Sequence, residues 1–262
     1  MPVHLSLDPT VAVITLDRPE RRNALAIDDW LALRDAVYRI GDVRAVIVTG
    51  SGGHFSAGMD LSPANPLVQR IGPAVIEGRE QPARDTLEEL KGCVQALADL
   101  EVPTFAAIEG ACVGGGFEIA LACDVRIAAR DARISRPEAR AGMIPDLGGC
   151  ARLTRLVGPG RAADLVCTGR SVDGEEAFRL GCVERVVAPG TALAAAREAA
   201  AQVAGNGPTA VRLALNVVRI APDLGLAEAL SVETRAGVMA LTSGEPREGI
   251  QAVLEKRPPR WS

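Results

Sequence analysis

Three acidic residues in the middle of the chain could exchange protons with a substrate. They are Glu118, Glu138 and Asp146, and each lies next to a glycine-bearing segment. Glu118 follows the triple glycine 114–116, and its neighbours from 117 to 121 are otherwise apolar. A carboxyl group in apolar surroundings holds its proton more tightly than in water, which suits a general acid or base. The sequence therefore predicts a proton-transfer site here.

Each acid also has a purely structural interpretation. Glu118 could complement the dipole of a helix on a wet surface. Glu138 follows Arg136-Pro137 and could be a solvated loop charge. Asp146 precedes Leu147-Gly148-Gly149 and could cap the helix that begins there.

Two glycine-bearing loops follow buried strands, at 56–60 (SAGMD) and 114–118 (GGGFE). Glycines before a helix let the backbone approach a ligand and direct free N–H groups at it. Two such loops could supply two N–H donors to one oxygen, which is how an oxyanion hole is built. Ordinary tight turns are the structural alternative. GxGxxG is absent from both loops, and the chain has no P-loop GK[ST] motif.

The apolar pattern predicts strands that alternate with helices. Expected strands are 3–7, 11–17, 44–50, 103–109, 124–129, 132–135 and 183–187. Expected helices are 26–40, 86–100, the segment from the triple glycine to about 122, 209–220, 224–241 and 246–256. From about residue 147 onward, helices are expected to dominate, apart from the strand at 183–187. Residues 62–83, rich in Pro, Gly and charge, are expected to form a long loop. The alternation predicts an α/β fold with a mixed sheet, followed by a helical tail that covers the core or another subunit.

Composition argues against several classes of protein. Four Phe, two Trp, one Tyr and a net charge of −4 do not suit a protein that stacks bases in a basic groove. Six cysteines without a CxxC pair, together with only two histidines, argue against a metal site and favour reduced, mostly buried thiols. Neither a secretory signal nor a membrane span is recognisable. We expect a cytoplasmic protein that binds neither nucleic acid nor membrane.

With its two glycine-bearing loops and the acids near them, the sequence resembles the enoyl-CoA hydratase/isomerase (crotonase) superfamily over nearly its whole length. The matching segments are LDRPERRNAL (16–25), AVIVTGSGGHFSAGMDL (45–61), AAIEGACVGGGFEIALACDVRIAA (106–129), SRPEARAGMIPDLGGCARL (135–153) and EGIQAVLEKRPPRW (248–261). The resemblance implies a crotonase-type α/β fold, with a superhelical core of ββα units in residues 1–190. It also implies a C-terminal helical region, 191–262, that forms trimers, often paired into hexamers.

The resemblance further implies an acyl-CoA thioester substrate and no cofactor, since coenzyme A is part of the substrate. The family's oxyanion hole matches the N–H groups of Met59 and Gly115, and its two catalytic glutamates match Glu118 and Glu138. The coenzyme A contacts that the resemblance implies are Arg21, Arg22, Ala57, Asp60, Leu61 and Lys256, the last often reaching a neighbouring subunit.

Asp146 keeps the reaction open. An Asp at this spacing is similar to Δ3,5-Δ2,4-dienoyl-CoA isomerases, which use three acids, although their first acid is commonly Asp rather than Glu. Because both hydratase glutamates are present, the sequence favours a 2-enoyl-CoA hydratase over a double-bond isomerase. Thioester hydrolysis and decarboxylation are further chemistries of the superfamily. A catalytically inactive or RNA-binding member is the alternative of another class, but RNA binding would need a basic stripe, and the arginines are spread out.

Arg136 departs from the family pattern, since many hydratases have a neutral polar residue before the Pro-Glu pair. We expect its guanidinium to pair with Glu138 or another acid and to lower the pKa of that acid.

Overall fold

The computed structural model describes residues 2–261 as a mixed α/β structure. The strands are β1 (Val3–Leu7), β2 (Val11–Leu16), β3 (Ala45–Gly50), β4 (Thr104–Ile108), β5 (Ala111–Val113), β6 (Val125–Ala129), β7 (Arg133–Ser135), β8 (Ser171–Val172) and β9 (Arg185–Val187). The α-helices are α1 (Ile27–Tyr38), α2 (Pro66–Ile76), α3 (Glu80–Ala98), α4 (Gly115–Ala122), α5 (Gly149–Val157), α6 (Pro159–Thr168), α7 (Gly174–Leu180), α8 (Ala192–Ala204), α9 (Pro208–Ile220), α10 (Leu226–Leu241) and α11 (Glu245–Leu254). Short 3-10 turns are η1 (Pro19–Arg21), η2 (Glu138–Ala141) and η3 (Ala221–Asp223).

The main sheet has the strand order β1-β2-β3-β4-β6-β9. Strand β1 pairs antiparallel with β2, whereas the other neighbours are parallel. A smaller sheet, β5-β7-β8, lies beside it and joins β5 to β7 in parallel. The predicted mixed α/β architecture is confirmed. Because β3 and β4 are parallel, the segments that follow them leave the main sheet at the same edge. The first glycine-bearing loop follows β3, and the second follows β4 after the short strand β5.

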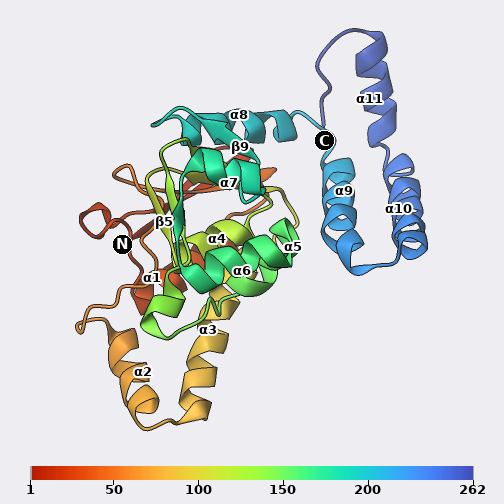
Figure 1. Ribbon diagram of the computed structural model, residues 1–262. Coiled ribbons are helices and arrows are strands. Elements are labelled where there is room, and N and C mark those ends of the chain that lie inside the picture. Colours follow the sequence, from red (N-terminus) through yellow and green to blue (C-terminus); the bar gives the residue numbers. More distant parts are fainter. Residues whose placement is uncertain (1, 262) are drawn as a thin grey trace.

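The two faces of the main sheet bury different side chains, as the two-residue period of a strand requires. Val13, Ile47 and Phe105 pack with Ala196 and Ala199 of α8 on one face. On the other face the strand side chains belong to a larger apolar core built with α1, α3 and α4. Figure 1 shows α8 over one side of the sheet and α4, α5 and α6 on the other. The small Ala side chains of α8 allow the close approach of helix and sheet.

The expectation of a long loop at 62–83 is wrong. Most of this segment forms α2 and the first turn of α3, which Figure 1 shows as a projecting helical pair. Asn65 begins α2 because its side chain accepts a hydrogen bond from Leu67 N–H at 3.0 Å. Pro66 stands at the first helical position, where proline is favourable. Pro82 lies in the first turn of α3, where its missing N–H would have no helical acceptor.

Two smaller differences also have local causes. The two-residue strand β8 lies in a stretch expected to be helical after about residue 147, and it is too short for a two-residue period to be visible. Asp146 is not the N-cap of α5, because the helix begins at Gly149 and Gly148, with φ of +102°, takes the cap position. The side chain of Asp146 is therefore free for another role.

Helices α9, α10 and α11 lie to one side of the molecule (Figure 1), where Arg219 of α9 donates to Asp124 Oδ1 at 2.7 Å and to Leu100 O at 2.6 Å. They expose large apolar side chains, among them Leu226, Val238, Leu241, Val253 and Leu254. Helix α8 packs on the sheet, although it falls after residue 190. The division of the chain at that residue stays a prediction.

The six cysteines are free thiols, and four of them are buried, as expected: Cys93, Cys112, Cys123 and Cys182. Burial raises the pKa of the Cys182 thiol to about 11. In the described part of the chain, residues 2–261, no helix has the length and apolar character to cross a membrane.

Candidate active site

The first glycine-bearing loop is fixed by backbone pairing to the segment before α1. Leu25 N–H donates to Gly58 O at 2.7 Å, and Asp60 N–H donates to Leu25 O at 2.9 Å. Gly58 has φ of +87°, and a Cβ atom there would lie 2.6 Å from Val113 O. Only glycine combines this backbone conformation with this close approach. Between these bonded amides, Met59 N–H has no acceptor among residues 2–261.

The second loop brings another free amide beside the first. Helix α4 begins at Gly115, and the first N–H groups of a helix have no partner inside it. A Cβ atom on Gly115 would lie 3.0 Å from the Trp30 ring and 3.8 Å from the Met59 nitrogen. The amides of Met59 and Gly115 are therefore neighbours. An oxygen atom could accept from both, which is the arrangement that stabilises an oxyanion.

Strand-like pairing between the loops holds the two amides together. Ser56 N–H donates to Ala111 O, and Val113 N–H donates to Ser56 O, each at 2.9 Å. The Ser56 hydroxyl donates to Asn23 O at 2.7 Å and accepts from Gly58 N–H at 3.1 Å. These bonds fix the position of the Met59 amide relative to the Gly115 amide.

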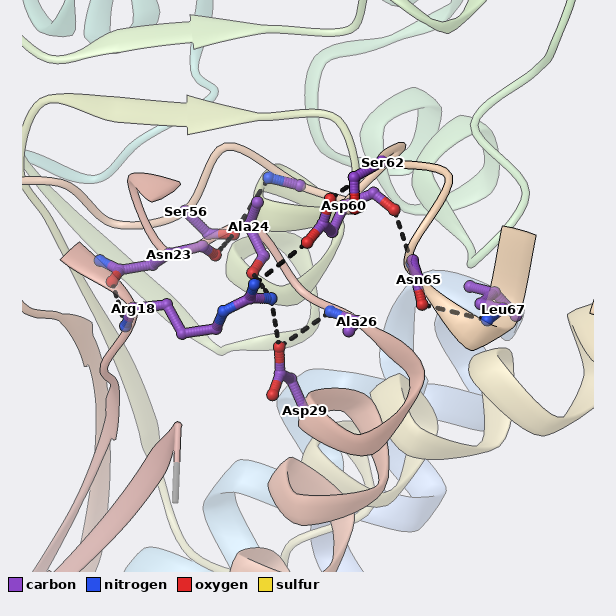
Figure 2. A network of polar contacts seen from close by, with 11 residues as sticks. Arg18, Asn23, Ala24, Ala26, Asp29, Ser56, Asp60, Ser62, Asn65 and Leu67 are labelled. Atoms are coloured by element: carbon purple, nitrogen blue, oxygen red, sulfur yellow. Dashed lines mark hydrogen bonds and ion pairs between the residues drawn. The ribbon is translucent and has the colours of Figure 1, made fainter. Parts of the chain in front are cut away.

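An arginine network supports the same loop from below (Figure 2). The Arg18 guanidinium donates to Asp29 Oδ2 at 2.9 Å and to Asp60 Oδ2 at 3.1 Å, and Asp29 Oδ2 also accepts from Ala26 N–H at 2.8 Å. The Ser62 backbone N–H lowers the pKa of Asp60, and Arg18 lowers it further. The network joins the end of β2, the start of α1 and the residue after Met59.

Glu118 lies in the first turn of α4 and is buried, with 3% of its surface exposed. Its Oε1 accepts from Leu147 N–H at 2.9 Å and from Gly149 N–H at 2.8 Å. Burial raises the pKa of Glu118, while the nearby Arg136 guanidinium opposes this rise. The expected lowering of the pKa by Arg136 is present, but burial is the larger effect, so the pKa of Glu118 is raised overall.

Glu138 begins η2 and faces the start of α4. Its Oε1 lies 3.5 Å from where a Cβ atom of Gly114 would be. Both carboxylate oxygens are buried, and neither accepts a hydrogen bond from a group in residues 2–261. The expected pairing with Arg136 is present as a loose ion pair, with Nη2 3.6 Å from Oε1. Both glutamates therefore lie close to the triple-glycine loop. Glu118 accepts hydrogen bonds from backbone N–H groups, whereas Glu138 accepts none from residues 2–261.

Asp146 lies at the edge of this acid cluster. Burial raises its pKa, and the charge of Glu138 adds to the rise. Asp146 lines a pocket of about 430 Å³ together with residues of α3, namely Glu80, Ala83, Arg84, Leu87, Glu88 and Lys91. The lining combines the charged side chains of Glu80, Arg84, Glu88 and Lys91 with the apolar side chains of Ala83 and Leu87.

The family model for enoyl-CoA hydratase/isomerase matches residues 7–262. The chain belongs to the enoyl-CoA hydratase/isomerase (crotonase) family. It is 35% identical over 257 residues to a crotonyl-CoA hydratase from Syntrophomonas wolfei, covering 97% of this chain and 95% of that protein. It is also 35% identical over 268 residues to a carnitinyl-CoA dehydratase from Salmonella heidelberg, covering 99% and 97%. The crystal structure of an enoyl-CoA hydratase from Bacillus anthracis superposes with a TM-score of 0.89 at 34% identity, covering 100% of this chain and 99% of that one.

The coenzyme A contacts expected for a crotonase lie in two separate places. Arg21 and Arg22 are exposed, and Ala57 N–H donates to Arg22 O at 2.8 Å, so these residues adjoin. Leu61 directly follows Asp60 in the chain and is 62% exposed. The Asp60 side chain is instead committed to Arg18 and to Ser62 N–H. Its backbone is also bonded, since Asp60 N–H donates to Leu25 O and Asp60 O accepts from Asn65 Nδ2.

Lys256 is not brought to the loops of its own chain. It is exposed and follows α11, which lies away from α1 and α4 in Figure 1. A contact between Lys256 and a ligand at Met59 would therefore have to come from another copy of the crotonase chain.

Sequence reasoning missed three residues that shape this crotonase site: Arg18, Asp29 and Trp30. Arg18 lies in the matched segment LDRPERRNAL, but nothing local distinguishes its role from those of Arg21 and Arg22. Trp30 is fully buried against Gly115. Trp30 is one of two tryptophans in a chain with few aromatic residues, and this rarity could have marked it as a residue with a special place in the fold.

Proposed function

We propose that this chain is a 2-enoyl-CoA hydratase, which adds water across the double bond of an enoyl thioester. The observation that carries the proposal is the pair of neighbouring amides at Met59 and Gly115, with Glu118 and Glu138 behind them. Met59 and Gly115 donate to the thioester oxygen and stabilise the enolate that forms when water attacks.

The hydrogen-bond environments divide the work between the glutamates. The two N–H donors to Glu118 Oε1 and the nearby Arg136 favour its carboxylate form and oppose the rise in pKa that burial causes. In this proposal Glu118 takes a proton from water as the water oxygen bonds to C3. The electrons of the C2–C3 double bond move toward the thioester and form the enolate. Glu138, whose buried oxygens accept no hydrogen bond from residues 2–261, has the other role and delivers the proton to C2. Exchange with solvent then resets both acids.

Coenzyme A is proposed to lie along Arg21, Arg22, Ala57, Asp60 and Leu61, with Lys256 of an adjacent copy on its phosphates. The exposed apolar side chains of α9 to α11 support a homotrimer or hexamer, since patches of this kind mark association surfaces.

Single substitutions test the proposal. Glu118→Gln and Glu138→Gln should each lower the kcat for crotonyl-CoA hydration by about 10²–10⁴. Glu198→Gln, an identical chemical change on the exposed face of α8, is the matched control and should leave kcat unchanged. Near wild-type turnover in either site variant would refute the two-acid mechanism.

Double-bond isomerisation is the second candidate, favoured by the burial of Asp146 beside Glu138. A third acid could move a proton between more distant carbons of a dienoyl chain. Products from 2-enoyl-, 3-enoyl- and 3,5-dienoyl-CoA should be identified for the wild type and for Asp146→Asn. A hydratase keeps most of its activity in this variant, whereas a dienoyl isomerase loses its double-bond shift.

A further inference from the structure

The Arg136 guanidinium lies between the two glutamates and is almost fully buried. Its Nη2 is 3.2 Å from Glu118 Oε1 and 3.6 Å from Glu138 Oε1, with 1% of the Arg136 side chain exposed. Its Nη1 donates to Gly114 O at 2.9 Å. One cation thus contacts both acids and the residue before the Gly115 amide.

The surrounding chain leaves room for this guanidinium. A Cβ atom at Gly149 would overlap Arg136 Nη2, so the glycine at the start of α5 is what admits the arginine. On another side, the guanidinium carbon lies 5.7 Å from the centre of the Phe117 ring, within the range of a cation–π contact. Neither Nε nor Nη2 makes a well-aligned hydrogen bond to a group in the described residues. The arginine is thus held by its Nη1 hydrogen bond to Gly114 O and by charge attraction to the two glutamates.

The charged and titratable groups around Glu118 come from several elements. They are Arg136 after β7, Glu138 on η2, Asp146 before α5, and Cys150 and Arg152 on α5. Without Arg136, three carboxyl groups would share a site with little neutralisation. Neighbouring carboxylates in such a site keep a proton, because like charges oppose ionisation.

We propose that Arg136 is a positioning residue that holds Glu118 as a carboxylate base and keeps it apart from Glu138. This inference rests on the proposed hydratase function, in which Glu118 accepts the proton of water. Arg136 touches neither substrate nor reacting atoms in this scheme. It acts through the glutamates and through Gly114.

The test compares wild type, Arg136→Gln and Arg136→Lys, with Arg126→Gln as matched control. Arg126 is also buried and paired, but with Glu184 and with the carbonyls of Cys123 and Cys182. Arg126→Gln therefore measures the effect of losing a buried arginine elsewhere. The readouts are kcat and KM for crotonyl-CoA against pH, and the infrared band of protonated carboxyl groups against pH, assigned by its loss in Glu118→Gln.

Loss of the positive charge favours protonated Glu118, so the acidic limb of kcat should move to higher pH in Arg136→Gln. The Glu118 infrared band should persist to higher pH in the same variant. We expect kcat at neutral pH to fall about 10²-fold with little change in KM. Arg136→Lys keeps the positive charge, so the acidic limb of its pH profile of kcat should stay near that of wild type. This holds even if the maximum kcat of the variant is lower.

An unmoved limb and an unmoved infrared band in Arg136→Gln would overturn the proposal and leave Arg136 a structural residue like Arg126. A limb displaced upward in Arg136→Lys would also contradict it. If wild type does not hydrate crotonyl-CoA, the hydratase proposal fails. The infrared titration still decides whether Arg136 sets the protonation of Glu118.

Discussion

Arg18 and Asp60 form an ion pair across 42 positions of sequence, with Nη2 3.1 Å from Oδ2. The pair fixes the residue that directly follows Met59, and through Asp29 it fixes the start of α1. In the proposed enzyme this ion pair keeps the Met59 amide aimed at the thioester oxygen.

Asp60→Asn should weaken both the loop and the reaction. The variant loses the charge that Arg18 faces, so we expect an unfolding free energy lower by about 1–3 kcal/mol. A displaced Met59 amide should lower kcat by about 10-fold, which corresponds to roughly 1.4 kcal/mol. Asp35→Asn, in the exposed pair with Arg34, is the control and should change stability by less than about 0.5 kcal/mol. Urea unfolding and crotonyl-CoA kinetics measure both, and wild-type values for Asp60→Asn would show that the pair is dispensable.

Gly115→Ala should block the proposed oxyanion hole. The new methyl group would press on the Trp30 ring and lie near the Met59 nitrogen, so kcat should fall by about 10²–10³, as when one donor is lost. Gly92→Ala on α3 is the matched control, because no atom lies within 4 Å of its Cβ position. The control should be more stable by about 0.5–1 kcal/mol and equally active. Unchanged turnover in Gly115→Ala would place the thioester oxygen elsewhere.

Gly149→Ala should disturb the acid cluster without changing any acid. Its Cβ would overlap Arg136 Nη2 and lie 2.7 Å from Glu118 Oε1, so one of these groups must move. Overpacking of this kind costs about 1–3 kcal/mol in stability, and we expect a parallel loss of kcat. Gly160→Ala on α6 has open space around it and serves as the comparison. If Gly149→Ala and Gly160→Ala had the same stability and the same kcat, the displacement of Arg136 or Glu118 would have no effect on folding or activity.

The stability difference between Glu118→Gln and wild type should depend on pH. Burial raises the pKa of Glu118 above its usual 4.5, so the folded state binds its proton more tightly than the unfolded state does. The stability that this proton contributes is present below about pH 4.5 and is lost as the pH rises through the folded-state pKa. Glutamine has no such dependence, so the variant should gain stability relative to wild type toward neutral pH. Urea unfolding at several pH values measures this gain, and a constant difference would contradict the burial argument.

Short-range patterns in the sequence determined much of this protein. The alternation of strands and helices, the glycines before α4 and the acids at Glu118 and Glu138 could all be read from neighbouring residues, because backbone conformation and amphipathic period are local properties. The family also followed from local motifs in a fixed order. Helix α2 was not predicted, because Pro66 at its start and Pro73 in its interior suggested a loop.

Only the tertiary structure decided which side chains meet. Arg18 joins both Asp29 and Asp60, and Arg136 lies between Glu118 and Glu138. Asp146 does not cap α5, because Gly148 takes that position. Such pairings depend on how parallel strands bring distant loops to one edge of the sheet, and on where a missing Cβ leaves room for a buried charge. Local composition does not encode these distances, since they arise from the packing of the whole chain.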